Sequence, residues 1–306
     1  MAERIENARK YVALVDQLNN IIVVLDLSRG DLTCEDAVLW QWSPQPEQGF
    51  SFTRNVRHRL DEAKLCYSPA WGGEVLAVCS SSGFLGLVEY PSGCCLWNQA
   101  AVGYGPHSME VLPDGSVAVA CSGNGVRERG CIRVYSARKG RESNVYTEFP
   151  LPGAHGVLWD PERELLWCLG NERLIACCWI DGMELSEFSG LGGMLPARGG
   201  HDLSPVYGNS DRLWVSSRTV WQFSKTQNAF LSDYFGVEEI ARPSVKSVGS
   251  FADGTVVQAV ASNVYAPHDT DLLTILKPKN GGLERCVIRF LGRSFYKARI
   301  FLSARL

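Results

Sequence analysis

The chain has 306 residues, of which 33 are acidic and 30 basic, and a formal net charge of −3. It contains no extended basic run and no uninterrupted apolar stretch of about 18 residues, which argues against nucleic-acid binding and against a membrane-spanning helix. The polar N-terminal segment lacks the apolar core of a signal peptide, and the 11 cysteines include no CxxC pair. We therefore expect reduced, mostly buried thiols and a cytoplasmic protein.

Apolar runs of strand length recur along the chain, each bounded by turn residues. The six most similar runs are Tyr11–Gln17, Glu74–Ser80, Gly115–Gly123, Glu164–Gly170, Asp211–Ser216 and Gly254–Val260. A further strand is predicted after each run, at Ile21–Leu27, Phe84–Tyr90, Cys131–Ser136, Leu174–Ile180, Val220–Ser224 and Leu272–Leu276. A more polar strand follows in turn, at Ala37–Trp42, Cys95–Ala100, Asn144–Phe149, Met183–Phe188, Ala229–Tyr234 and Arg285–Phe290. Strands that recur in fours about every 45 residues are typical of propeller blades.

The predicted fold is therefore an all-β, six-bladed β-propeller with four antiparallel strands in each blade. We expect one domain over residues 1–306, with blades at about 10–58 plus 294–306, 59–104, 105–152, 153–198, 199–242 and 243–293. The N-terminal blade has only three strands of its own, whereas the C-terminal segment 294–301 has no strand after it. Pairing of these two chain ends would close the ring and remove its free sheet edges.

Three of the five histidines occupy the same position in successive blades. His107, His155 and His201 lie 48 and 46 residues apart, and each comes just before a short apolar run. The innermost strands of a propeller surround one axis, so we expect these side chains to converge at one mouth of the central channel. Packing alone gives no reason for histidine to recur in this way.

The other three blades are predicted to place ionisable residues at the same position. Lys246 aligns with His107 because the segments 107–115 and 246–254 match without a gap, and Lys297 follows 51 residues later. In the second blade either Glu62 or Lys64 takes this position, and the spacing does not decide between them.

Clustered ionisable side chains indicate a ligand-binding or catalytic centre. Three neutral imidazoles suit a divalent ion such as Mn, Zn, Ni or Ca, so the three histidines are the predicted metal ligands. Glu62 could be a fourth ligand or could bind one of the ligand histidines. A neighbouring cation would lower the pKa of Lys246, which makes it a candidate general base, and Tyr296 and Lys297 are further catalytic candidates. Equally, Lys246 and Lys297 could bind an anionic group by charge.

Several residues near this position are predicted to contact a substrate. Besides Glu62 and Lys64, they are Trp71, which lies in a turn and could stack on a sugar face, and Tyr104, which shortly precedes His107. Arg59 belongs to a basic connector together with Arg54, Arg57 and His58 and could bind an anion. The alternative for the aromatic residues is core packing, and for the connector it is a solvated surface.

Segments at 61–64, 80–83, 106–113, 155–160 and 199–203 resemble those of a bacterial propeller family of unknown function. This resemblance spans nearly the whole chain and implies six blades. More distantly, the repeated histidines are similar to those of the oligogalacturonate lyases, propeller enzymes that hold a divalent metal with histidines and act on uronic acid residues by elimination. The similarity implies metal binding by His107, His155 and His201, and it identifies no base.

The predicted function is a metal-dependent enzyme that acts on an acidic carbohydrate. Elimination is the favoured reaction, and hydrolysis of a glycoside or a lactone is the alternative. A function of a different class is a non-catalytic propeller that binds an anionic sugar or a protein partner at the same mouth. Sensitivity of ligand binding to a chelator, together with a test for turnover, separates these hypotheses.

Overall fold

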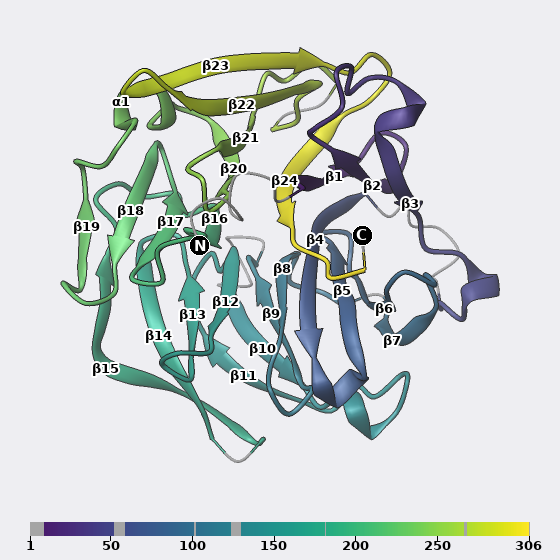
Figure 1. Cartoon of the computed structure of the whole chain (residues 1–306). Helices are drawn as coiled ribbons and strands as arrows, with labels where there is room; N and C mark the ends of the chain where they lie inside the picture. The colour runs from purple at the N-terminus through teal and green to yellow at the C-terminus, as the bar shows by residue number, and fades with distance from the viewer. Residues whose placement is uncertain are drawn as a thin grey trace. The chain divides into compact units, whose positions relative to one another are not determined.

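The computed structural model describes residues 9–51, 59–100, 102–123, 130–180, 182–265 and 268–305. Over these residues the chain is a six-bladed β-propeller built from six four-stranded antiparallel sheets, as the repeat predicted (Figure 1). The residues form two compact units: a continuous unit of residues 43–201 and a two-segment unit of residues 1–42 and 202–306. No helix in the described part of the chain is long and apolar enough to cross a membrane.

The continuous unit contains three sheets whose strands follow the chain in order. The first sheet comprises β4 (Leu60–Ser68), β5 (Gly73–Ser80), β6 (Phe84–Glu89) and β7 (Cys95–Gln99). The second comprises β8 (Pro106–Val111), β9 (Val117–Cys121), β10 (Cys131–Tyr135) and β11 (Tyr146–Pro150). The third comprises β12 (Gly156–Asp160), β13 (Leu165–Leu169), β14 (Arg173–Ile180) and β15 (Glu184–Met194). The first strands pack side by side, β8 against both β4 and β12.

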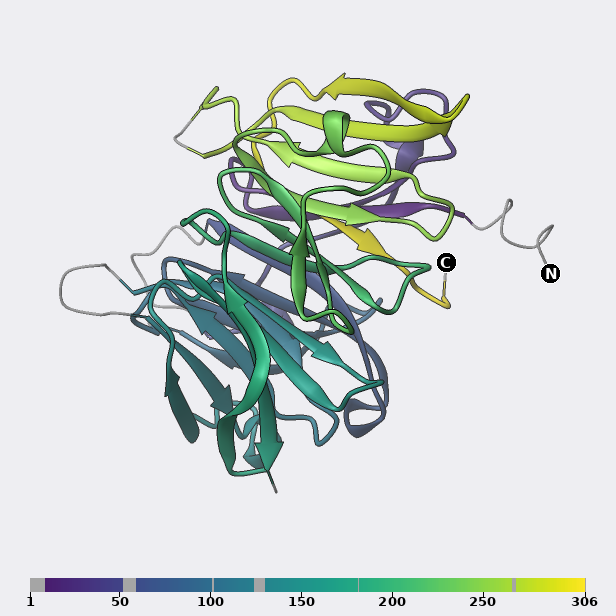
Figure 2. The same cartoon turned by 90° about the vertical axis from the view of Figure 1, so that its left-hand side faces the viewer.

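The two-segment unit also contains three sheets. One comprises β16 (Asp202–Pro205), β17 (Arg212–Ser216), β18 (Val220–Ser224) and β19 (Ala229–Leu231). The next comprises β20 (Val245–Ser250), β21 (Val256–Val260), β22 (Leu272–Lys279) and β23 (Gly282–Arg289), and the long hairpin of its last two strands is yellow in Figure 2. The third has the order β24 (Phe295–Phe301), β1 (Tyr11–Asp16), β2 (Ile21–Asp26) and β3 (Val38–Trp42). Here β20 packs against both β16 and β24.

Within the described residues, helical structure is confined to short segments. The α-helix α1 spans Val237–Ile240, and 3-10 turns lie at Glu35–Ala37, Pro46–Gln48, Pro69–Trp71 and Ala137–Lys139.

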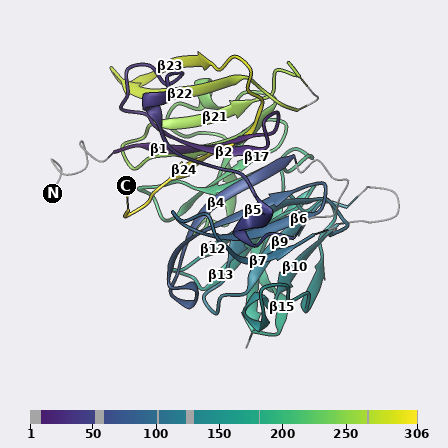
Figure 3. The same cartoon turned by 90° about the vertical axis from the view of Figure 1, so that its right-hand side faces the viewer.

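The C-terminal strand completes the N-terminal blade, as predicted. β24 runs antiparallel to β1 and pairs Phe301 with Tyr11 and Ala298 with Leu14. The yellow β24 lies beside the purple β1 in Figures 1 and 3. This pairing joins the two ends of the chain in one sheet and covers an edge of β1 that would otherwise be exposed.

The second strands of the sheets are apolar because both of their faces are buried. All five residues of β9 and all five of β13 are buried, which explains runs without polar alternation. All 11 cysteines are free thiols within the described residues, and seven are buried, in agreement with their place in apolar runs. The outer strand β11 instead alternates between exposed and half-buried residues, as expected for a strand that ends a sheet.

Candidate functional site

The three repeated histidines form a stack in the continuous unit. His107 lies in β8, His155 directly precedes β12, and His201 is the last residue of the unit. The ring centroids of His107 and His155 are 4.2 Å apart with an interplanar angle of 41°. Those of His155 and His201 are 5.0 Å apart with an angle of 44°. All three side chains are half-buried, so the stack combines a fixed position with access to solvent.

Backbone carbonyls orient two of the imidazoles. The Nδ1 atom of His107 lies 2.8 Å from the carbonyl oxygen of Gly105, and that of His155 lies 3.1 Å from the carbonyl oxygen of Gly153. A carbonyl only accepts, so Nδ1 carries the proton in both rings, and in a neutral ring Nε2 is the acceptor. The stack therefore has a defined tautomer at two of its three members.

A glycine two residues before each histidine makes this arrangement possible. Gly105, Gly153 and Gly199 all have positive φ angles, of 58°, 63° and 92°. This left-handed conformation is costly for other residues. The recurring Gly-x-His pattern is a sequence signal that the spacing analysis missed.

The side chain of His107 is aimed by a β-bulge. Pro106 pairs with Cys121 and Ser108 with Ala120, so His107 is the extra residue on β8. Bulges of this kind change the direction of a side chain and are common next to active sites. A register shift of the same kind occurs in β4 and β20, the first strands of two other sheets, and it shows which of their residues is equivalent to His107.

In β4 the bulged residue is Asp61, and the prediction of Glu62 or Lys64 at this position was wrong. Leu60 pairs with Ser80 and Glu62 with Cys79, so Asp61 is the extra residue. Its Oδ2 accepts a hydrogen bond from the backbone N–H of Ser81. A bulge adds one residue to one strand only, and spacing along the chain cannot reveal which strand carries it.

Glu62 and Lys64 instead join strands inside the continuous unit. Glu62 is fully buried. The Nζ of Lys64 donates to the carbonyl oxygen of Val157 at 2.6 Å and lies 3.2 Å from Oε2 of Glu110. Lys64 thus connects β4 to β8 and β12.

In the two-segment unit, β20 has a bulge at Lys246 and β24 has one at Tyr296 or Lys297. Val245 pairs with Val260 and Ser247 with Ala259, which leaves Lys246 as the extra residue on β20. The pairing register also shifts at the start of β24. Ala298 pairs with Leu14 and Phe295 with Asp16, so two residues of β24 lie opposite one residue of β1.

Hydrogen bonds between first strands show which residue of β24 is equivalent to the histidines. The Oγ of Ser108 accepts from the backbone N–H of Val157 at 3.5 Å, and that of Ser247 accepts from Ala298 at 2.8 Å. The donor lies two residues after His155 in the first case and two after Tyr296 in the second. The assignment of Lys297 to the repeated position was therefore wrong by one residue, which in a strand reverses the face.

Lys297 belongs to a buried ionic cluster with Asp202 and Arg299. The Nη1 and Nη2 atoms of Arg299 donate to the two carboxylate oxygens of Asp202 at 2.9 and 2.6 Å. Asp202 also accepts from the backbone N–H of Val248 at 3.0 Å, and the Nζ of Lys297 lies 3.5 Å from its Oδ1. Asp202 and Lys297 have no exposed surface. The cluster ties β16, β20 and β24 together.

Lys246 is half-buried and close to other cationic groups of the two-segment unit. Burial, followed by the charge of Lys297, lowers the pKa of Lys246 from 10.5 to about 8. The charge of Lys246, followed by burial, lowers the pKa of His268. His268, a residue that the sequence analysis did not select, therefore lies near Lys246.

The remaining predicted substrate contacts have other surroundings. The Nε1 of Trp71 donates to the carbonyl oxygen of Gly115 at 2.9 Å, and Trp71 lies beyond the end of β4 opposite to Asp61. The ring of Tyr104 covers the guanidinium of Arg133 at 4.3 Å. These contacts indicate packing for both aromatic side chains. Arg59 is exposed just before β4, whereas Arg54, Arg57 and His58 lie outside the described residues.

A protein-bound metal ion needs donor atoms of several side chains directed at one point. Within the described ranges, no group of three or more His, Cys, Asp or Glu side chains is arranged to hold a metal. The histidine rings are close together, but proximity of rings does not direct three donor atoms at one point about 2 Å from each. The described residues therefore give no support to metal binding by the three histidines.

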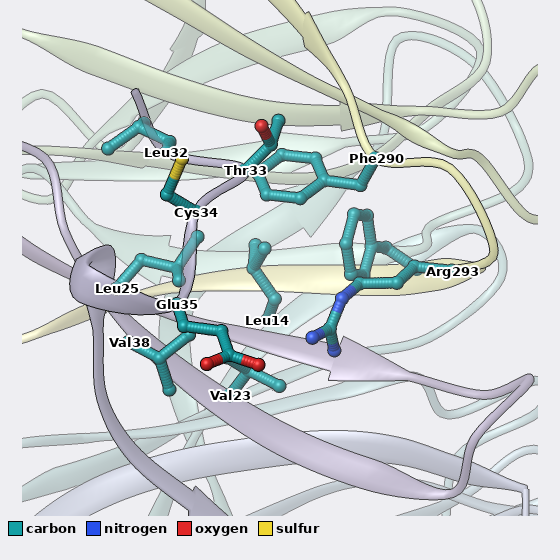
Figure 4. A pocket seen from close by; sticks show the side chains of 11 residues that line it. Leu14, Val23, Leu25, Leu32, Thr33, Cys34, Glu35, Val38, Phe290 and Arg293 are labelled. Carbon is teal, nitrogen blue, oxygen red and sulfur yellow. The ribbon is translucent and has the colours of Figure 1, made fainter. Parts of the chain in front are cut away.

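A small pocket lies elsewhere in the two-segment unit (Figure 4). Its lining is mostly apolar, with Glu35 and Arg293 as the charged members. The Nη1 of Arg293 lies 3.3 Å from Oδ2 of Asp16. None of the residues predicted to carry function lines this pocket.

Solved structures of other proteins are similar to this chain in fold. No protein-family model and no curated protein sequence matches it. A functionally unknown protein from Desulfotomaculum acetoxidans DSM 771 has a TM-score of 0.54 and 11% identity, over 94% of this chain and 79% of that one. The dihydro-heme d1 dehydrogenase NirN in complex with DHE has a TM-score of 0.50 and 14% identity, over 94% of this chain and 55% of that one. These similarities support the propeller and show no relation to oligogalacturonate lyases.

Proposed function

We propose that the stack of His107, His155 and His201 is the ligand-binding centre of the protein and that its ligand is an acidic carbohydrate. The observation that carries this proposal is the contact between three imidazoles at one repeated position, two of them oriented by backbone carbonyls. Clustered ionisable groups of this kind are typical of functional sites.

The chemistry of the imidazoles fits a ligand with both hydroxyl and carboxylate groups. A neutral ring whose Nδ1–H binds a carbonyl can accept a hydroxyl proton at Nε2, and a protonated ring can donate from Nε2 to a carboxylate. The bond from Nδ1 to the carbonyl is the same in both states. His107 and His155 can therefore each serve either kind of group without moving.

Elimination is the reaction we propose if the centre is catalytic, and Asp61 is the observation that favours it. Asp61 occupies the bulge on the strand next to His107, so a carboxylate and an imidazole hold equivalent positions on neighbouring strands. An imidazole would take the proton next to the substrate carboxylate while the carbon–oxygen bond to the leaving group breaks. A carbon–carbon double bond forms, and the departing oxygen takes a proton from a second, protonated imidazole of the stack.

Binding is tested by thermal shift and calorimetry with galacturonic acid, its oligomers and neutral galactose as probes. We expect the acidic probes to raise the Tm of the wild-type protein, and the double variant His107→Ala/His155→Ala to lose this effect while keeping its far-UV circular dichroism. Lys139→Ala, which removes an exposed charge from the continuous unit, is the control and should behave as the wild type. Equal stabilisation of the double variant would refute the proposal.

Two additions to the same assay separate the mechanisms. Binding that disappears with a chelator and returns with Mn or Zn would contradict a site without a metal. Absorbance from an unsaturated uronate product, present in the wild type and absent in His107→Ala, would identify the lyase. Binding without turnover would leave the protein as a non-catalytic carbohydrate-binding propeller.

A further inference from the structure

The starts of β20 and β24 come together with one loop in the two-segment unit. Lys246 and Tyr296 lie at the bulges of these two adjacent strands, which are linked by the hydrogen bond from Ala298 to Ser247. The loop between β21 and β22 carries His268. These three side chains come from three separate parts of the chain, so only the fold brings them together.

Backbone and side-chain bonds hold the loop against both strands. Thr270 and Phe295 exchange two backbone hydrogen bonds, of 3.0 and 2.6 Å, directly before Tyr296. At the other end of the loop, the N–H of Ala261 donates to the carbonyl oxygen of Ser244 at 2.9 Å, close to Lys246. Asp269 is fully buried and accepts from the hydroxyl of Ser294. The loop is therefore anchored on both sides of His268.

The side chains form a gradient of exposure. Tyr296 is 7% exposed, Lys246 is half-buried, and His268 is exposed. The anchored loop thus places a buried phenol, a half-buried amine and an accessible imidazole at the start of the same two strands. All three can donate a hydrogen bond, and two can carry a positive charge.

The ionisable side chains Lys246, Lys297 and His268 lie near one another in this region. The charge of Lys246 disfavours the protonated form of His268, and the charge of Lys297, one residue after Tyr296, disfavours that of Lys246. An anion bound beside Lys246 and His268 would favour the protonated form of both side chains.

We propose that Lys246 and His268, with Tyr296 beside them, form a second binding site that takes a small oxyanion, either phosphate or a carboxylate. This site does not depend on the function proposed for the histidine stack. The half-buried amine would contact the anion from the strand, and the exposed imidazole would cover it from the loop.

The proposal is tested by thermal shift at neutral pH and constant ionic strength, with inorganic phosphate, sulfate and acetate compared against chloride. We expect at least one oxyanion to raise the Tm of the wild type. Lys246→Ala should abolish this shift, and His268→Ala should reduce it. Lys277→Ala removes an exposed lysine from β22 of the same unit and should keep the full shift. The oxyanion with the largest effect distinguishes a phosphate site from a carboxylate site.

Two outcomes would overturn the proposal: no stabilisation of the wild type by any of the three anions, or an equal shift in Lys246→Ala. If Lys246→Ala fails to fold, Lys246→Arg supplies the measurement, since it keeps the charge and should keep a shift that Lys246→Gln loses. The histidine-stack variant His107→Ala/His155→Ala should keep the phosphate shift, so failure of one proposal is distinguishable from failure of the other.

Discussion

At the scale of single residues, the backbone determines how the functional side chains are presented. His107 and His155 owe their orientation to carbonyl oxygens of glycines with positive φ, and His107 and Lys246 owe theirs to bulges. The histidines were predictable from the sequence because their spacing is regular. Asp61 and Tyr296 were not predicted at this position, because a bulge shifts the register by one residue without leaving a signal in the spacing.

Substitution of Gly153 by alanine should destabilise the protein and disturb His155. The φ angle of Gly153 is 63°, and an added Cβ would lie 2.7 Å from Cβ of Asn171. We expect a loss of about 1–2 kcal/mol from the left-handed conformation alone, measured by urea unfolding. Gly30→Ala is the control, because nothing lies within 4 Å of its added Cβ. A Gly153→Ala variant as stable as this control would contradict the role of the glycine.

Lys246 should make the stability of the protein depend on pH in the alkaline range. Its pKa is lowered to about 8 in the folded protein, where it faces Lys297 on β24 and His268 in the loop. Below pH 8 both folded and unfolded chains hold the proton. Between about pH 8 and 10.5 the unfolded chain holds more protons, so the free energy of unfolding contributed by this group rises with pH.

This contribution is measured as the difference in urea-unfolding free energy between the wild type and Lys246→Met at several pH values. The free energy of unfolding of the wild type should rise relative to that of the variant as the pH increases from 8 to 10.5. A difference that stays constant over this range would show that the folded and unfolded pKa values of Lys246 are the same.

At the scale of strands, neighbouring first strands are tied by buried polar side chains. Asp202 at the start of β16 binds the guanidinium of Arg299 on β24 and a backbone N–H of β20. In the continuous unit, Lys64 of β4 reaches Glu110 of β8 and the backbone of β12. The strand positions were predictable from apolar runs, but these ties were not, since each joins residues from different blades.

Asp202→Ala should be among the most destabilising substitutions in the chain. It would leave the buried Arg299 and Lys297 without their shared carboxylate, and removal of one partner from a buried ion pair costs about 3–5 kcal/mol. Chemical denaturation measures the loss. Glu187→Ala, which breaks an ion pair of exposed Arg173, is the comparison and should cost less than about 1 kcal/mol.

At the scale of the whole molecule, one sheet joins the two ends of the chain. β24 supplies a strand to the N-terminal blade, contacts β20, and carries two members of the buried ionic cluster. This closure was predicted because the N-terminal blade lacked a strand and the C-terminal strand lacked partners. The chain also divides into two compact units, which the repeat along the sequence does not predict.

Truncation of the C-terminal strand should therefore abolish cooperative folding. A chain that ends before Phe295 loses the partner of β1 and leaves Asp202 buried without Arg299. We expect loss of the cooperative thermal transition in circular dichroism, whereas a chain that ends after Phe301 keeps all of β24 and should unfold nearly as the full chain does. A cooperative transition in the shorter chain would show that β24 is dispensable.

The sequence alone determined the number of blades, most strand positions, the closing strand and the three histidines. These features follow from patterns that repeat along the chain, because burial on both faces demands apolar runs and each blade uses the same pattern. The tertiary structure alone decided that Asp61 and Tyr296 share the position of His107, that Lys64 and Lys297 bind within the protein, and that His268 lies near Lys246. Those outcomes depend on bulges and on contacts between distant segments, which spacing along the chain does not record.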